Sequence, residues 1–164
     1  MSEVSIGGQI SLQVILILIN AVFACAEIAV LSANENRLES MKKEGNKRAA
    51  KILHLIDEPS RFLSTIQVGI TLAGFLASAF AADNFSDRLV DLFIKLGLNI
   101  NPATLDTIAI VLITIILSYF TLIFGELVPK RLAMKNPEKI SLIISGLIFS
   151  VSKIFSPIVW LLTI

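Results

Sequence analysis

Residues 105–131 read LDTIAIVLITIILSYFTLIFGELVPKR, and this stretch decides the class of fold. No charged residue lies between Asp106 and Glu126, and about 20 apolar residues are enough for a helix to cross the roughly 30 Å of hydrocarbon in a bilayer. We therefore predict a membrane-spanning helix over about residues 105–128. The composition agrees, because 55% of the 164 residues are hydrophobic and 16% are charged, whereas soluble domains are about 25% charged.

Two more stretches of the chain are long and apolar enough to cross a membrane, at about residues 10–31 and 62–82. A further apolar region, 140–164, is interrupted by Lys153 and Pro157. The pieces that remain, 140–152 and 154–164, are of a length more typical of interfacial helices than of spans. We predict three spans, followed by an interfacial region over about 138–164.

The segment of about residues 34–56 carries an amphipathic helical pattern. Its apolar positions are Leu38, Met41, Ala49, Ile52, Leu53 and Ile56. We expect one basic helix lying in the cytoplasmic interface, and a separate short helix that is capped by Ser86 and ended by Gly97. The predicted fold is thus an all-α membrane domain over residues 1–164, with three transmembrane helices, juxtamembrane amphipathic helices and a dimeric assembly.

The distribution of basic residues predicts the orientation. Seven basic residues lie between Ala33 and Phe62 and four lie in 129–139, whereas the connection 83–106 holds two basic residues against four aspartates. Basic connections remain on the cytoplasmic side. We therefore expect a multi-pass protein of the cell membrane, with its N-terminus outside and its C-terminus in the cytoplasm.

Composition also excludes several classes of function. Fourteen basic and thirteen acidic residues give a net charge of +1, so no nucleic-acid partner is expected. The single cysteine, Cys25, rules out an internal disulfide. We do not expect an enzyme, because the sequence holds no Gly-x-Ser-x-Gly element and the lone histidine, His54, lies outside the predicted spans.

Two carboxylates interrupt the predicted spans, and ionisable groups there are functional candidates because they cost about 2.5–3.5 kcal/mol to insert. Glu27 and Glu126 each lie near the cytoplasmic end of a span, at similar depth. Pro129 has no N–H, so the Gly125 carbonyl loses its helical donor and becomes available as an oxygen ligand. Carboxylate and carbonyl oxygens suit Mg²⁺ or Ca²⁺. Alternatively, Glu126 pairs with Lys130 or Arg131, and Glu27 pairs with a basic residue of another cytoplasmic segment.

Buried amides and small residues form a second set of candidates. Asn20 and Gln67 lie inside predicted spans, where an amide needs hydrogen-bond partners. Small residues recur every four positions in the second span, at Gly69, Ala73, Ala77 and Ala81. Such a face lets helices approach closely, and it is either a packing surface within one subunit or the seam of a homodimer.

Several motifs occur along the chain in a characteristic order. They are Glu27 with Leu31-Ser32-Ala33, then Arg37-Leu38-Glu39, Gly45-Asn46, Pro59, Leu63-Ser64-Thr65-Ile66-Gln67-Val68-Gly69-Ile70-Thr71, and Phe124-Gly125-Glu126-Leu127-Val128-Pro129-Lys130. This order resembles the transmembrane domain of the CNNM/CorC family, in its hemolysin-like branch. The resemblance implies a three-span dimer that exports magnesium or another divalent cation. It also implies a cytoplasmic pair of nucleotide-binding CBS domains, a region that this chain does not include.

The resemblance further implies a magnesium site built from a first-span serine, a second-span asparagine with backbone carbonyls, and the third-span glutamate, which Glu126 matches. The first-span element reads Phe23-Ala24-Cys25-Ala26-Glu27 here, without its serines, and the second-span Gly-Asn-x-x-x-Asn element reads Gly69-Ile70-Thr71-Leu72-Ala73-Gly74, without its asparagines. The candidate cation ligands are Glu126, Gly125, Glu27, Gln67 and Gly69. The leading expectation is export of Mg²⁺, bound as substrate. The alternatives are export of an organic cation such as a polyamine, or a non-transporting dimeric anchor for nucleotide-binding domains.

Overall fold

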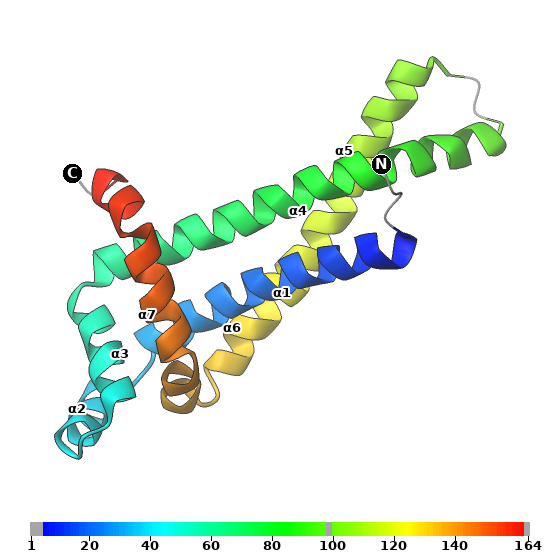
Figure 1. Ribbon diagram of the computed structural model, residues 1–164. Coiled ribbons are helices and arrows are strands. Elements are labelled where there is room, and N and C mark those ends of the chain that lie inside the picture. Colours follow the sequence, from blue (N-terminus) through cyan, green and yellow to red (C-terminus); the bar gives the residue numbers. More distant parts are fainter. Residues whose placement is uncertain (1–4, 98–99, 163–164) are drawn as a thin grey trace.

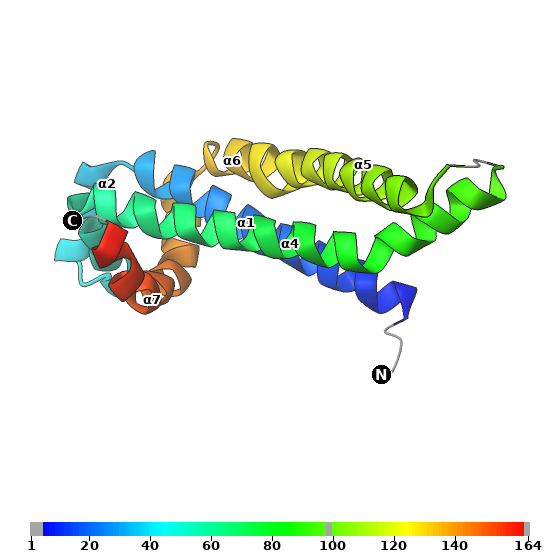
Figure 2. The same cartoon turned by 90° about the horizontal axis from the view of Figure 1, so that it is seen from above.

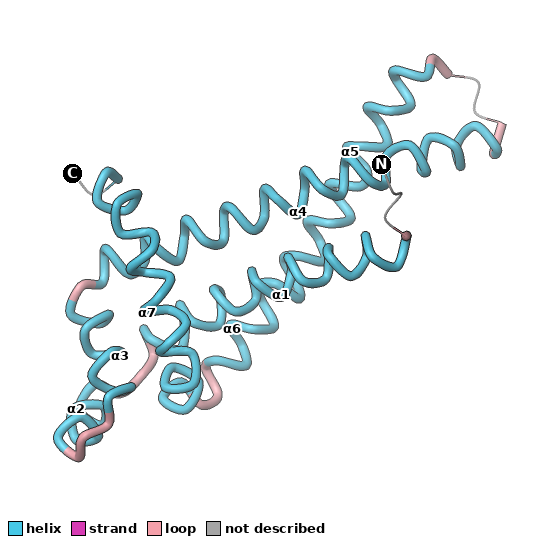
Figure 3. The backbone as a smooth tube through the Cα atoms, in the orientation of Figure 1, coloured by secondary structure: helices cyan, strands magenta, loops and turns pink. Residues whose placement is uncertain are grey.

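The computed structural model describes residues 5–97 and 100–162, and these form helices joined by short turns (Figures 1 and 3). Three long helical rods lie alongside one another. They are α1 (Ile6–Leu31), α4 (Pro59–Lys95), and a rod made of α5 (Pro102–Leu122), η1 (Ile123–Leu127) and α6 (Val128–Ala133). All three rods are long and apolar enough to cross a membrane, and they contain the predicted spans.

Helix α4 extends well beyond the predicted span. The expectation of a separate helix starting at Ser86 is wrong, because α4 continues through this residue to Lys95, bending over its last turns (Figure 2). Ser86 is buried, and its hydroxyl donates a 2.7 Å hydrogen bond to Asp106 Oδ1 of α5. The polar residue that looked like a helix cap therefore ties two rods together.

The predicted single helix over 34–56 is two helices, α2 (Glu35–Lys43) and α3 (Lys47–Asp57). Gly45 lies between them with φ of 90°, a backbone conformation that favours glycine. The Asn46 side chain then accepts hydrogen bonds from the backbone N–H groups of Arg48 and Ala49 and caps α3. The predicted apolar stripe is nevertheless buried, with Leu38 of α2 and Ile52 of α3 both fully inaccessible.

The final helix, α7 (Pro137–Leu162), runs without interruption through Lys153 and Pro157, so the two apolar pieces of the predicted interfacial region belong to one helix. A proline inside a helix removes one backbone hydrogen bond, and the helix is held by its packing against α1, α3 and α4, where Ile148 is fully buried. Figures 1 and 2 show that α7 lies across one end of α1 and α4 instead of running along them. Its position at a membrane surface remains a prediction.

The small-residue face of α4 packs within the chain. Ala73, Ala77 and Ala81 are at most 5% exposed, and the last two belong to one buried apolar cluster with Leu117 of α5. A side chain on Gly69 would lie 2.8 Å from the ring of Phe23 on α1, so this glycine allows the two helices to approach closely. Of the two interpretations left open by the sequence, the structure supports packing inside one subunit, and the predicted homodimer needs another surface.

Candidate cation site

The two carboxylates predicted to lie at similar depth meet at one lysine. Lys130 Nζ of α6 lies 3.1 Å from Glu27 Oε2 of α1 and 2.9 Å from Glu126 Oε1 of η1. The three side chains are about a quarter to a third exposed (26%, 24% and 36%, in that order). Both ion pairs were among the alternatives that the sequence left open, and the structure joins them through a single ammonium group.

Glu126 lies on an irregular turn of helix. Residues Ile123–Leu127 form a π-helical turn, in which the Val128 N–H donates to the Ile123 carbonyl. Pro129 cannot donate the next helical bond to the Gly125 carbonyl. Short π-helical turns of this kind are frequent at functional sites.

The Gly125 carbonyl is partnered by Asn20, across 105 positions of sequence. Asn20 Nδ2 of α1 donates to this oxygen at 3.4 Å, and a Cβ on Gly125 would lie only 3.1 Å from the same nitrogen. Because a carbonyl only accepts hydrogen bonds, the amide nitrogen must face Gly125 and Oδ1 must point elsewhere. Asn20 is 4% exposed, and within the described part of the chain its Oδ1 has no hydrogen-bond partner.

Asn20 and Glu126 line one cavity of about 490 Å³ between α1, α4 and the third rod. Its other polar lining residues are Thr71, Ser78, Ser118 and Thr121, and its remaining lining residues are Ile70, Gly74, Phe75 and Leu122. The cavity is therefore lined by hydroxyl, amide and carboxylate groups together with apolar side chains. Such a cavity suits a ligand that has both a charged and an apolar part.

The structure separates the predicted ligands into two groups. Glu126 lines the cavity, Gly125 adjoins it through the Asn20 amide, and Glu27 is connected to it through Lys130. Gln67 is exposed on α4 and Gly69 is buried under the Phe23 ring, so the structure does not bring these two to Glu126. Among the described residues, no group of three or more His, Cys, Asp or Glu side chains is placed to hold a metal ion.

A polar face of α1 extends from the site along the helix. Gln13, Asn20 and Glu27 are seven residues apart, so they lie on one face, and Gln9 lies one turn before Gln13. Gln9 Nε2 donates to Asn84 Oδ1 at 2.9 Å. Gln13 is 8% exposed beside an apolar groove next to α5, and within the described residues neither of its amide atoms has a partner. The seven-residue spacing that places Asn20 on the same helix face as Glu27 is the feature of the sequence that could have identified Asn20 as a site residue.

Comparisons with known proteins agree with this architecture. The family described as the cyclin M transmembrane N-terminal domain (CNNM) matches residues 11–164. A UPF0053 protein of Synechocystis is 36% identical over 148 residues, which cover 90% of this chain and 33% of the relative. A polyamine export protein of Haemophilus influenzae is 31% identical over 149 residues, again 90% and 33% of the two chains. A UPF0053 inner membrane protein of Escherichia coli is 29% identical over 144 residues, 88% of this chain and 30% of the relative. The chain spans about a third of the length of these relatives.

Proposed function

We propose, from the premise that the chain belongs to the CNNM family of cyclin M transmembrane domains, that it is the membrane part of a cation exporter. Its proposed cargo is an organic cation with primary ammonium groups, the chemical class of the polyamines. The observation that carries this proposal is the Lys130 ammonium, which lies within 3.1 Å of one carboxylate on α1 and of another on η1.

The primary ammonium group of Lys130 illustrates how the proposed cargo would bind these carboxylates. A primary ammonium has three donors and no acceptor, and its charge-assisted hydrogen bonds to carboxylates are among the strongest in proteins. Glu27 and Glu126 are spaced so that one such group satisfies both of them. A diamine in the adjoining cavity is proposed to present the same group to Glu126.

The rest of the cavity supports an organic cargo. Ile70 and Gly74 line it at the two positions where the Gly-Asn-x-x-x-Asn element of the family that the sequence resembles has asparagines. Without these asparagines the cavity lacks the asparagine ligand of the magnesium site and has apolar surface for a methylene chain. The ring of Phe75 adds a face on which a second ammonium can be held. The name of the polyamine export protein among the relatives supports the same class of cargo.

Magnesium is the second candidate cargo, and one observation favours it. Glu126 and Asn20 Oδ1, which has no partner among the described residues, are hard oxygen ligands on one cavity. Mg²⁺ keeps several of its waters and is often held by one or two carboxylates, so two protein oxygens are sufficient for a hydrated ion.

Isothermal titration of the purified chain separates these proposals. We expect 1,4-diaminobutane to bind wild type and to bind Glu126→Gln at least tenfold more weakly, the factor for about 1.4 kcal/mol lost with one charged hydrogen bond. Asp87→Asn, an exposed carboxylate on the far part of α4, is the matched control and should bind like wild type. Binding of MgCl₂ but not of the diamine would show that the site takes a metal ion and would overturn the organic cargo. Binding of neither would favour the non-transporting anchor.

A further inference from the structure

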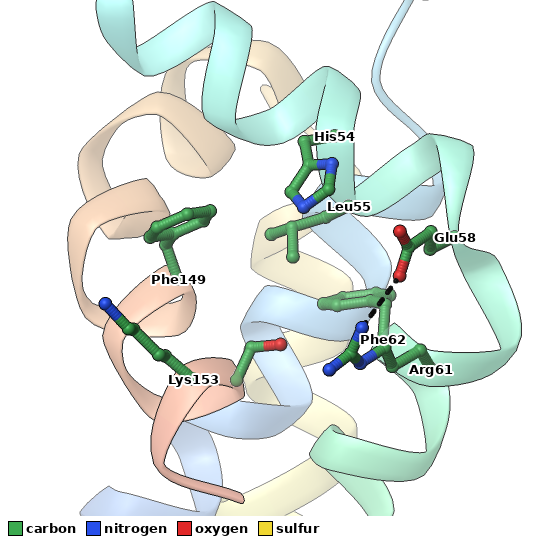
Figure 4. A pocket seen from close by; sticks show the side chains of 8 residues that line it. His54, Leu55, Glu58, Arg61, Phe62, Phe149 and Lys153 are labelled. Carbon is green, nitrogen blue, oxygen red and sulfur yellow. Dashed lines mark hydrogen bonds and ion pairs between the residues drawn. The ribbon is translucent and has the colours of Figure 1, made fainter. Parts of the chain in front are cut away.

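A second pocket lies away from Glu27 and Glu126, where α3, α4 and α7 meet (Figure 4). Its volume is about 150 Å³. Figure 4 shows His54 and Leu55 of α3 on one side, Phe149 and Lys153 of α7 on a second, and Arg61 and Phe62 of α4 on the third. Three separate helices therefore contribute one basic or titratable side chain each.

The charges of this pocket favour an anion. Arg61 and Lys153 carry two positive charges against the single negative charge of Glu58, whose carboxylate accepts from Arg61 Nη1 at 3.3 Å. Lys51 adds a third positive charge nearby, with its Nζ 5.3 Å from the centre of the Phe149 ring. Helix α4 also begins here with no side-chain cap from the described residues, so the positive end of its dipole adds to the same field.

The apolar part of the pocket favours an anion that is attached to a hydrocarbon. Phe62 and Leu55 are 1% and 4% exposed and form a buried wall. The Phe149 ring lies 6.1 Å from the His54 ring, centre to centre, and covers another side. A free, fully hydrated ion gains nothing from such walls, whereas the glycerol and first methylenes of a lipid do.

The level of the pocket along α4 is that of a lipid headgroup. Arg61 is the last charged residue before the uncharged stretch 62–82, and this stretch lies in a helix that is apolar enough to span a membrane. The charged end of a span coincides with the headgroup layer. Basic pockets between helices at this level are typical binding sites for anionic lipid headgroups.

We propose that this pocket binds the phosphate group of an anionic phospholipid. Arg61 supplies a planar fork of donors for the phosphate oxygens and Lys153 supplies a point charge, while Leu55, Phe62 and Phe149 contact the lipid backbone. Because α3, α4 and α7 all contribute, an occupied pocket holds α7 against the start of α4. The proposal is independent of the cargo at Glu126.

Native mass spectrometry and thermal unfolding of the purified chain in detergent test the proposal, with phosphatidylglycerol as probe and phosphatidylcholine as the zwitterionic comparison. We expect phosphatidylglycerol to bind more tightly and to raise the melting temperature more. Inorganic phosphate and glycerol phosphate form the soluble arm. If either stabilises the chain as well as phosphatidylglycerol does at equal concentration, the site takes free phosphate and the lipid assignment is overturned.

Lys153→Gln is the decisive variant, because Lys153 is exposed and its replacement leaves the packed walls intact. The dissociation constant for phosphatidylglycerol should rise about fivefold, which corresponds to about 1 kcal/mol per basic residue near an anionic membrane surface. Lys153→Arg should retain wild-type binding. Lys43→Gln removes one exposed charge of α2 outside the pocket and should also retain it. Equal binding by Lys153→Gln, Lys43→Gln and wild type overturns the proposal.

Discussion

Single residues of this domain take partners from distant parts of the chain, and Lys130 is the clearest case. Its ammonium forms ion pairs with Glu27 of α1 and Glu126 of η1 at once. The lysine is therefore both a structural link between two rods and a competitor for any cation that approaches these carboxylates. The proposed exporter would have to displace it, or share it, each time cargo binds.

Replacing Lys130 with glutamine tests this competition. The variant leaves two carboxylates close together without their shared counter-charge, so we expect unfolding stability to fall by about 1 kcal/mol, a modest value because the side chains are partly exposed. Added 1,4-diaminobutane should restore the melting temperature and should bind more tightly than it binds wild type. Lys135→Gln, which removes an exposed lysine five positions on, is the control. Equal diamine affinity in wild type and Lys130→Gln would show that the lysine does not compete.

Gly69 and Gly146 form a matched pair for the packing of α1 on α4. A Cβ at Gly69 meets the buried Phe23 ring at 2.8 Å, whereas at Gly146 of α7 no described atom lies within 4 Å. Gly69→Ala should lower the free energy of unfolding by about 1–3 kcal/mol through overpacking. Gly146→Ala should raise it by up to about 1 kcal/mol through the better helix propensity of alanine. Thermal melts measure both, and a neutral Gly69→Ala would mean that Phe23 moves aside at little cost.

At the scale of elements, the sequence predicted what depends on composition and missed what depends on distant contacts. The three spans follow from long uncharged stretches, and Glu27 and Glu126 stand out because charges are rare there. Ser86 looked like a helix cap because its partner, Asp106, lies 20 residues away.

The residues that line the cavity at Glu126 also depend on distant contacts and were mostly missed from the sequence. Ser78, Ser118 and Thr121, which line the cavity together with Thr71, were not predicted as site residues. Hydroxyl residues in apolar helices commonly bond to their own backbone, so their sequence positions carry little signal. Only the packing of α4 against the third rod gathers them around Glu126.

Pro129 controls the irregular turn that carries Glu126. Pro129→Ala supplies an N–H that can bond to the Gly125 carbonyl, regularise Ile123–Leu127 and take the acceptor away from Asn20. We expect diamine binding to weaken although no charge is removed. Pro137→Ala, at the first position of α7, is the control, because an N–H there has no helical acceptor in any case. If Pro129→Ala binds like wild type while Glu126→Gln does not, the carboxylate matters and the argument from the freed carbonyl is wrong.

Gln13 on the polar face of α1 should cost stability. Its buried amide has no partner within the described residues, and leaving such a group unsatisfied costs about 1–3 kcal/mol. Gln13→Leu should therefore raise the melting temperature. Gln9→Leu is the comparison on the same face. Gln9 Oε1 is also without a partner among the described residues, but this change breaks the 2.9 Å bond from Gln9 Nε2 to Asn84, so it should not raise the melting temperature. A lower melting temperature for Gln13→Leu would show that this amide has a partner in the membrane.

The whole molecule is polarised along its length. Helices α2, α3 and α7 gather at one end of the rods, whereas the start of α1, the end of α4 and the start of α5 lie toward the other (Figures 1 and 2). The first end holds the basic connections, the Glu27–Lys130–Glu126 cluster and the proposed phosphate pocket. The positive-inside rule predicts that this end is cytoplasmic, and with this orientation the cavity at Glu126 would receive its cargo from the cytoplasm. The homodimer remains a prediction, and its predicted seam on α4 is packed within the chain.

Accessibility of single cysteines tests this orientation. Asn46 and Asn101 lie in the two opposed connections, but both side chains accept hydrogen bonds from helix N-termini, so replacing them would weaken α3 and α5. Glu44 and Lys95 are exposed neighbours and are better probes. In a Cys25→Ala background, an impermeant thiol reagent added to intact cells should label the cysteine at position 95 and not the one at 44, because the connection with fewer basic residues is translocated. Both should label after the membrane is permeabilised, which controls for their reactivity. Labelling at 44 but not at 95 would reverse the orientation and would make the Glu126 cavity open to the outside.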